Sequence, residues 1–117
     1  MYVKKIGDVN KEEIKAGSGT TKQVLIGSKE GPNFAMRKFT IEPGGGMPLH
    51  TNSVEHEQYI LSGSAEVMIG DKKFEMKKDD IVFIPAGIPH SYTNKGKEPF
   101  EFLCMIPNKT DIMEIIK

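Results

Sequence analysis

The sequence predicts an all-β fold of the sandwich or barrel type. Turn-forming clusters rich in Gly, Pro, Asn and Asp recur about every eight to twelve residues, a spacing typical of such folds. The segments between them are short and rich in β-branched and aromatic residues, and helical periodicity is scarce. A chain of 117 residues can bury one core, so we expect a single domain over residues 1–117. The expected strands are KQVLIG, NFAMRKFTI, EQYIL, AEVMIG, KFEMK, DIVFIP, HSYTN and FEFLCMIP.

Helix is expected only near the two ends of the chain. Residues 9–15 can form one or two helical turns. Residues 110–116 (TDIMEII) can form a short terminal helix, with Thr110 or Asp111 as its N-cap.

The middle of the chain contains a predicted β-hairpin. The run AEVMIG is followed by DKK and then by FEMK, and Gly70 and Asp71 supply residues suited to a tight turn. We therefore expect these two runs to pair as antiparallel strands.

Two of the expected strands are apolar on both alternating faces. In residues 81–84 every side chain is large and hydrophobic, and residues 100–106 carry apolar side chains on both faces. A strand covered on one side only should alternate between apolar and polar residues. We expect these strands to be covered twice, by the interior and by a second layer or a partner subunit.

Composition excludes several classes of partner. Sixteen basic and sixteen acidic residues give zero net charge, and Arg37 is the only arginine, so nucleic acid is not an expected partner. No apolar run has the length of a membrane span, and the first residues lack a signal-peptide core. The single cysteine, Cys104, excludes an internal disulfide and fits a reducing compartment. These features favour a cytoplasmic protein without a membrane partner.

All three histidines lie in two short segments. His50 and His56 belong to PGGGMPLHTNSVEHEQYILSG, and His90 belongs to IPAGIPHSYTN. Asn52 is two residues from His50, so the two share a strand face, and His56 can point the same way. Neutral imidazole is a common ligand of transition metals, and the convergence of these side chains inside a barrel is feasible for a mononuclear site. The alternative is an empty barrel with surface or hydrogen-bonded core histidines.

The same two segments resemble the paired signatures of the cupin superfamily, in particular its small single-domain conserved-barrel members. The resemblance covers residues 34–107 and implies a double-stranded β-helix, or jelly roll, of about eight to ten strands with minimal helix. It also implies a homodimer. The matching residues are Gly44, His50 and Gly63 in the first signature and Pro85, Gly87, His90 and Asn94 in the second.

Three departures from these signatures alter what the resemblance implies. Asn52 stands where the family has its second histidine, His56 where it has a glutamate ligand, and Asp79 where it has a glycine. Similar small cupins carry histidine at the glutamate position, so the resemblance implies the ligand set His50, His56 and His90. Asn52 would coordinate through its amide oxygen, bind a metal-bound water, leave that position open, or act only as a turn residue.

An all-histidine site constrains both the metal and its ligand. We favour iron(II) or manganese(II), with zinc or nickel as the alternatives. No carboxylate of the signatures would offset the metal's double positive charge, so a small anion such as a carboxylate, an enolate or superoxide is the favoured exogenous ligand.

Strand alternation separates the neighbours of the histidines into two groups. Gln58 lies two residues after His56 and Tyr92 two residues after His90, so both should point inward, where Tyr92 would donate a proton or orient a bound anion. Tyr92 as a core aromatic is the alternative. Glu55 and Glu57 flank His56 and should point outward. Cys104 is expected to be a small core residue, with a position near the metal as the alternative.

The leading functional hypothesis is a mononuclear metalloenzyme that acts on a small anionic molecule. Dioxygenase-type oxidation is the first reaction class expected from the resemblance, followed by decarboxylation and isomerisation. The alternative is a non-catalytic module that binds a small ligand or a metal, since one fold hosts many activities.

Overall fold

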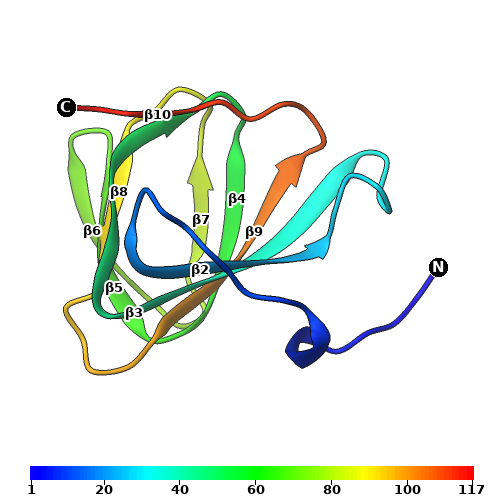
Figure 1. The fold of residues 1–117 in the computed structure, drawn as a ribbon. Coiled ribbons are helices and arrows are strands. Elements are labelled where there is room, and N and C mark those ends of the chain that lie inside the picture. Colours follow the sequence, from blue (N-terminus) through cyan, green and yellow to red (C-terminus); the bar gives the residue numbers. More distant parts are fainter.

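The computed structural model describes residues 1–117 as a single curled antiparallel sheet of ten strands (Figure 1). This architecture confirms the all-β jelly-roll prediction. One short 3₁₀ helix, η1, precedes the strands. The elements are η1 Ile6–Asp8, β1 Glu12–Glu13, β2 Ser18–Ile26, β3 Phe34–Asn52, β4 His56–Ser62, β5 Ser64–Ile69, β6 Lys72–Lys77, β7 Ile81–Ile84, β8 His90–Thr93, β9 Phe100–Pro107 and β10 Met113–Ile115.

The 19-residue strand β3 joins the two walls of the curled sheet. Its first part pairs with β2 and β9, and its second part pairs with β8 and β10. The change of direction falls at the Pro43–Gly46 segment, where Gly44 adopts φ +84°, a conformation that glycine reaches without strain. Because of this bend, the inward side chains of the two parts of β3 face each other across one interior.

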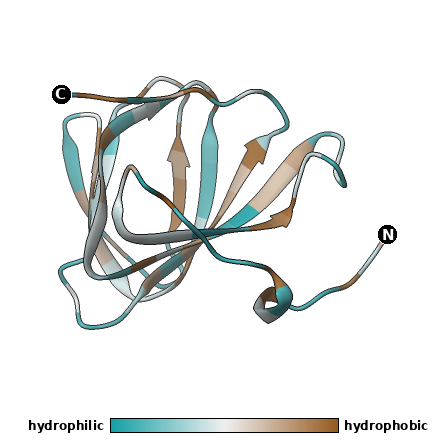
Figure 2. Ribbon diagram, in the orientation of Figure 1, coloured by the Kyte–Doolittle hydropathy of each residue, from teal (hydrophilic) through white to brown (hydrophobic).

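The interior is apolar at one end and polar at the other. Phe100, Ile41, Ile60 and Val67 are fully buried and belong to one continuous hydrophobic cluster. The buried polar side chains lie on the inward faces of the strands, as the hydrophobic ones do. Figure 2 shows the hydrophobic strand β7 beside the largely hydrophilic strand β4. The buried polar set includes Gln58, His50, His56, His90 and Asn52.

Of the two doubly apolar strands, β7 is covered on its inner face only, whereas the outward Leu103 and Met105 of β9 are half-buried. Val82 and Ile84 are buried, whereas Ile81 is 84% exposed and Phe83 is 55% exposed. On the adjacent strand β4, half-exposed Tyr59 pairs with Ile81. The expectation of a second layer within this chain was therefore wrong, because no element folds over this outer face. A partner subunit on it remains a prediction.

Both predicted terminal helices are absent. Residues 9–15 contain β1, which pairs with β2, and residues 110–116 contain β10, which pairs with the second part of β3. A helix this short leaves most of its terminal backbone groups unpaired, whereas an edge strand offers partners at once. The only helical turn is η1, where the amide of Gln23 donates to the carbonyls of Ile6 and Val9, each at 3.0 Å.

The predicted hairpin is confirmed. Strands β5 and β6 pair from Ser64↔Lys77 to Ile69↔Lys72, which leaves Gly70 and Asp71 as a two-residue turn. Gly70 has φ +61° there. The structure contains no helix with the length and apolar character needed to cross a lipid bilayer.

Candidate metal and anion site

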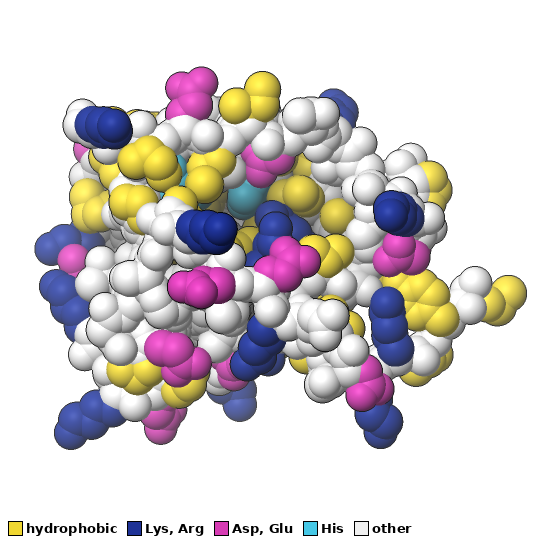
Figure 3. All heavy atoms as spheres, viewed as in Figure 1, with side chains coloured by type: hydrophobic (Ala, Val, Ile, Leu, Met, Phe, Trp, Pro, Cys, Tyr) yellow, Lys and Arg dark blue, Asp and Glu magenta, His cyan; other side chains and the backbone are white.

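A cavity of about 380 Å³ opens between the two walls of the sheet. Figure 3 shows histidine atoms in a hollow that is bordered by hydrophobic, basic and acidic side chains. We call its two sides the histidine wall and the arginine wall. The histidine wall is formed by β8 and the second part of β3, with Met47, His50, Asn52, His90 and Tyr92. The arginine wall is formed by β2, the first part of β3, β9 and β4, with Lys22, Arg37, Phe39, Phe102, His56 and Gln58.

Two histidines of the histidine wall are held by their own strands. Nδ1 of His50 lies 2.7 Å from the carbonyl oxygen of Pro48, and Nδ1 of His90 lies 3.0 Å from that of Ile88. A carbonyl only accepts, so both Nδ1 atoms carry the proton and donate it. In a neutral ring with this tautomer, Nε2 keeps its lone pair and can ligate a metal.

These two rings are adjacent and one of them is strongly desolvated. His50 and His90 are paired across β3 and β8, and their ring centroids are 4.2 Å apart. Burial lowers the pKa of His90 to about 4, so this imidazole is neutral at pH 7. His90 therefore presents a neutral nitrogen donor without a change in protonation.

His56 enters from the opposite wall and contacts different groups. Its Nε2 donates to Oδ2 of Asp111 at 3.3 Å, which leaves Nδ1 to accept the S–H of Cys104 at 3.4 Å. Burial lowers the pKa of His56 to about 4, with a smaller lowering from the charge of Arg37 and a partial opposing effect from Asp111. This ring is also neutral at pH 7.

Asp111 connects the C-terminal segment to this set. Its Oδ2 accepts a hydrogen bond from Nδ2 of Asn52 at 3.1 Å, and its Oδ1 accepts one from the backbone N–H of Ser53 at 3.1 Å. The remaining amide oxygen of Asn52 is buried without a partner. A buried acceptor without a partner lowers the stability of the fold unless a cation or a hydrogen-bond donor binds to it.

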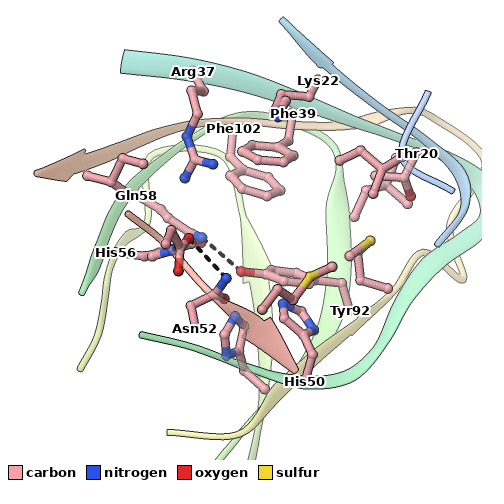
Figure 4. A pocket seen from close by; sticks show the side chains of 17 residues that line it. Thr20, Lys22, Arg37, Phe39, His50, Asn52, His56, Gln58, Tyr92 and Phe102 are labelled. Atoms are coloured by element: carbon pink, nitrogen blue, oxygen red, sulfur yellow. Dashed lines mark hydrogen bonds and ion pairs between the residues drawn. The ribbon is translucent and has the colours of Figure 1, made fainter. Parts of the chain in front are cut away.

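Arg37 carries an uncompensated positive charge into the pocket. No carboxylate forms an ion pair with it, and its Nη2 donates to Sγ of Cys104 at 3.1 Å. Its Nε is buried without a partner, and the guanidinium lies 4.9 Å from the ring centroid of Phe39. Figure 4 shows Arg37 and Lys22 across the pocket from His50 and Asn52. This arrangement favours binding of an anion.

Aromatic rings line the part of the pocket between the histidines and Arg37. Phe102 stacks on Phe39 at 5.2 Å and on Tyr92 at 5.4 Å between centroids. The hydroxyl of Tyr92 accepts a hydrogen bond from Nε2 of Gln58 at 2.8 Å, so its own proton stays available for a ligand. Burial raises the pKa of Tyr92, which keeps the phenol neutral. The amide oxygen of Gln58 is buried without a partner.

All six site residues expected from the sequence line this one pocket. They are His50, Asn52, His56, Gln58, His90 and Tyr92. Glu55 and Glu57 are exposed, as strand alternation predicted. Cys104 is fully buried and is both a core residue and a neighbour of His56.

Sequence reasoning missed the three charged residues of the pocket, Arg37, Lys22 and Asp111. Arg37 and Lys22 stand at inward strand positions, and the alternation of Arg37, Phe39 and Ile41 was the signal that could have found the first of them. Asp111 lies outside both signatures in a segment that was expected to be helical, so no pattern indicated it.

A sequence profile of the cupin domain matches residues 37–106 of this chain. The chain belongs to the cupin family. Among solved structures, this cupin is similar over its whole length to a polyketide cyclase from Streptomyces resistomycificus, with a TM-score of 0.92 and 27% identity over 86% of that chain.

Two curated proteins are also similar to this cupin in part of their sequences. A mannose-1-phosphate guanylyltransferase of Klebsiella pneumoniae is 36% identical over 62% of this chain, which covers 16% of that enzyme. A 1-methylthio-D-xylulose 5-phosphate methylsulfurylase of Rhodospirillum rubrum is 32% identical over 78% of this chain, which covers 58% of that protein. The cupin thus spans a minor part of the first relative and about half of the second.

The structure explains two of the signature positions in conformational terms. Asp79, which replaces a family glycine, has φ +73°, a region where Asp is tolerated better than most residues. Its carboxylate accepts a hydrogen bond from the hydroxyl of Tyr59 at 2.6 Å. Asn94 is buried, and its amide donates to the carbonyls of Ile41 and Glu98, each at 2.9 Å. Both residues shape the chain around the site.

The donors do not yet form one convergent set. No group of three or more His, Cys, Asp or Glu side chains is arranged closely enough to hold a metal ion in this structure. Instead there are two pairs, His50 with His90 and His56 with Asp111, and the rings of His56 and His90 are 6.1 Å apart. The three-histidine ligand set therefore remains a prediction.

Proposed function

We propose that this cupin is a metal-dependent enzyme that acts on a small organic anion with an apolar body. The observation that carries the proposal is the guanidinium of Arg37, which has no carboxylate partner and faces the same pocket as the imidazoles of His50 and His90. The guanidinium of Arg37 favours binding of an anion. The imidazoles of His50 and His90 favour binding of a metal cation, which would contact the same anion.

The residues present suit a divalent transition metal. His50 and His90 have their Nδ1 protons engaged by carbonyls, and the orphaned Oδ1 of Asn52 is a third donor on the same wall. His56 would complete the set from the opposite wall. When bound, the metal would supply Lewis-acid stabilisation of negative charge on the substrate. Iron or manganese is the favoured ion, with zinc or nickel as alternatives.

Arg37 and Lys22 are the groups that would bind the anionic end of the substrate. Lys22 is half-buried and its Nζ lies 4.0 Å from the exposed Glu12 carboxylate, a distance at the limit of an ion pair. The rings of Phe39 and Phe102 would pack against the apolar part. A cavity of about 380 Å³ lies at the lower end of the usual range for small-molecule sites.

Tyr92 and Gln58 would orient the substrate and provide a proton. The phenol is neutral because burial raises its pKa, and the Gln58 amide already donates to its oxygen, so the phenolic proton is free to be donated to a bound substrate. A proton donor beside a bound anion supports decarboxylation or isomerisation through an enolate. These reactions now rank ahead of oxidation by oxygen, which the sequence alone had favoured.

Turnover of defined anions tests this proposal. The metal-free protein is reconstituted with Fe(II), Mn(II), Zn(II) or Ni(II) and incubated with oxalate, pyruvate or benzoylacetate. Release of carbon dioxide, exchange of α-protons followed by NMR, and oxygen uptake distinguish decarboxylation, enolate formation and oxidation. We expect one of the first two, and we expect Arg37→Met to reduce it while exposed Lys29→Met does not.

Two results would overturn the proposal in different ways. Stoichiometric metal and tight anion binding without turnover of any of these compounds would support a non-catalytic binding module, the alternative expected from the sequence. Failure of the reconstituted protein to retain any transition metal would remove the metal-dependent part.

A further inference from the structure

The C-terminal segment crosses the pocket beside the histidine wall. Strand β10 pairs with the end of β3 in the register Met113↔Asn52 and Ile115↔His50, as Figure 1 shows at the C-terminus. The preceding residues are tied to Ser53, whose Oγ accepts from the N–H of Ile112 at 2.7 Å. This anchoring delivers Asp111 to the site from a segment that belongs to neither cupin signature.

The two oxygens of Asp111 have separate roles. Oδ1 accepts the Ser53 N–H at 3.1 Å and thereby holds the segment. Oδ2 instead faces the site, 3.1 Å from Nδ2 of Asn52 and 3.3 Å from Nε2 of His56. Anchoring alone would need only the first oxygen. The second lies between the two ligand positions at which this cupin departs from its family's signature.

The spacing matches two ligands of one ion. Ligand atoms about 2.1 Å from a common metal, at tetrahedral to octahedral angles, lie about 3.0–3.4 Å from each other. The distance of 3.3 Å between Oδ2 of Asp111 and Nε2 of His56 falls inside this range. The side chains are also shielded, with 18% of Asp111 and 8% of His56 exposed.

We propose that Asp111 is a metal ligand and supplies the carboxylate that the first signature lost when His56 took the glutamate position. The inference rests on the proposed metal site and names its anionic ligand. A divalent ion takes the place of the Nε2 proton that now lies between His56 and Asp111, and the ring stays neutral because it changes tautomer, with its proton on Nδ1 facing Sγ of Cys104. The site charge then falls from two positive charges to one. The sequence-based expectation of a site without a protein carboxylate is thereby replaced.

Metal affinity of matched variants tests this role. Asp111→Asn keeps the shape of the side chain and the Oδ1 acceptor but removes the charge, Asp111→Glu keeps the charge, and Glu114→Gln removes an exposed charge from the same segment. Dissociation constants for Zn(II) and Mn(II) are measured by calorimetry with chelator competition, and Co(II) absorption reports on the ligand set. We expect D111N to bind at least about tenfold more weakly. Asp111→Glu should recover part of the loss, and Glu114→Gln should match the wild type.

The thermal stability of the metal-free variants separates a ligand from an anchor. If D111N lowers the metal-free melting temperature but keeps the wild-type dissociation constant and Co(II) spectrum, Asp111 only anchors the segment and the inference is wrong. The proposed metal site survives that outcome. If the wild-type protein binds none of these ions, the metal site itself fails, and the two failures are therefore distinguishable.

Discussion

The two walls of the pocket satisfy their polar groups in opposite ways. On the histidine wall, His50 and His90 each donate to a carbonyl two residues earlier in their own segment. On the arginine wall, Arg37 and Gln58 contact Sγ of Cys104 on the strand between them, at 3.1 and 3.7 Å. Nε of Arg37 and Oε1 of Gln58 are nevertheless each buried without a hydrogen-bond partner. Local bonds thus fix the rings of His50 and His90, whereas the cross-strand contacts of Arg37 and Gln58 leave each of these two side chains incompletely bonded.

This difference assigns separate tasks to the walls. The histidine wall is preorganised because hydrogen bonds from Nδ1 to nearby backbone carbonyls orient the rings of His50 and His90 before any ligand binds. The arginine wall carries a positive charge that no protein carboxylate neutralises, so an anion must supply its partner. Metal affinity should therefore depend mainly on the first wall, to which the opposite wall adds only His56, and affinity for the anionic end of the substrate should depend on Arg37 and Lys22 of the second.

Lowering the pH should produce the largest effect, a loss of folding stability, because it protonates one histidine on each wall. His90 and His56 have folded pKa values of about 4 against about 6.5 when unfolded, so between these pH values only the unfolded chain binds the protons. Stability of the metal-free protein should be full above pH 6.5 and fall as pH drops toward 4, by about 3 kcal/mol per histidine. Urea unfolding at several pH values measures this loss. His90→Gln should remove part of the pH dependence, and an unchanged profile would contradict the neutral state of His90.

Truncation of the ring shared by both walls should have the next largest effect. Phe102 stacks between Phe39 and Tyr92 and is 3% exposed, so Phe102→Ala should cost about 3–5 kcal/mol of unfolding free energy. Leu103→Ala, on the half-buried outer face of the same strand, is the matched control and should cost about 1–2 kcal/mol. Equal losses in chemical denaturation would show that the pocket face is no better packed than the outer face.

Removal of one imidazole from the histidine wall should lower metal affinity, whereas removal of Arg37 from the other wall should not. His50→Ala or His90→Ala deletes a prealigned Nε2 donor and should weaken Zn(II) or Mn(II) binding at least about 100-fold. Calorimetry against a competing chelator measures the change. Arg37→Met should leave this affinity unchanged or tighter, because it removes a positive charge near His56. A large loss of metal in Arg37→Met would contradict the division of tasks.

Anion affinity should show the smallest but most specific effect. Arg37→Met removes charge-assisted hydrogen bonds and should weaken binding of benzoylacetate about 10-fold or more. Arg37→Lys keeps the charge without the guanidinium fork and should recover only part of that loss. Fluorescence or calorimetric titration of the metal-loaded protein measures both variants. Full affinity in Arg37→Met would place the anion site elsewhere.

Much of the site could be predicted because strand alternation is a local rule. Asn52 is two residues from His50, Gln58 two from His56 and Tyr92 two from His90, and the three pairs point inward as expected. The turn at Gly70 was equally local, since two-residue hairpins have strict conformational needs.

The contacts that complete the site could not be predicted in this way. Arg37, Cys104 and His56 meet from three strands that are far apart in sequence, and their contacts follow from sheet order and register. The C-terminal segment was expected to form a helix because its local pattern allows one. It forms an edge strand instead, because the end of β3 offers it paired backbone groups that no isolated helix of that length could match.

The sequence by itself therefore determined the all-β fold, the cupin family and the inward orientation of the predicted ligands, since each depends on spacing along the chain. Tertiary structure alone decided that Arg37 faces the histidines without a counter-ion and that the carboxylate of Asp111 lies beside His56 and Asn52. The physical reason is that charge compensation depends on distance in space, and the bend of β3 and the pairing of β10 set those distances.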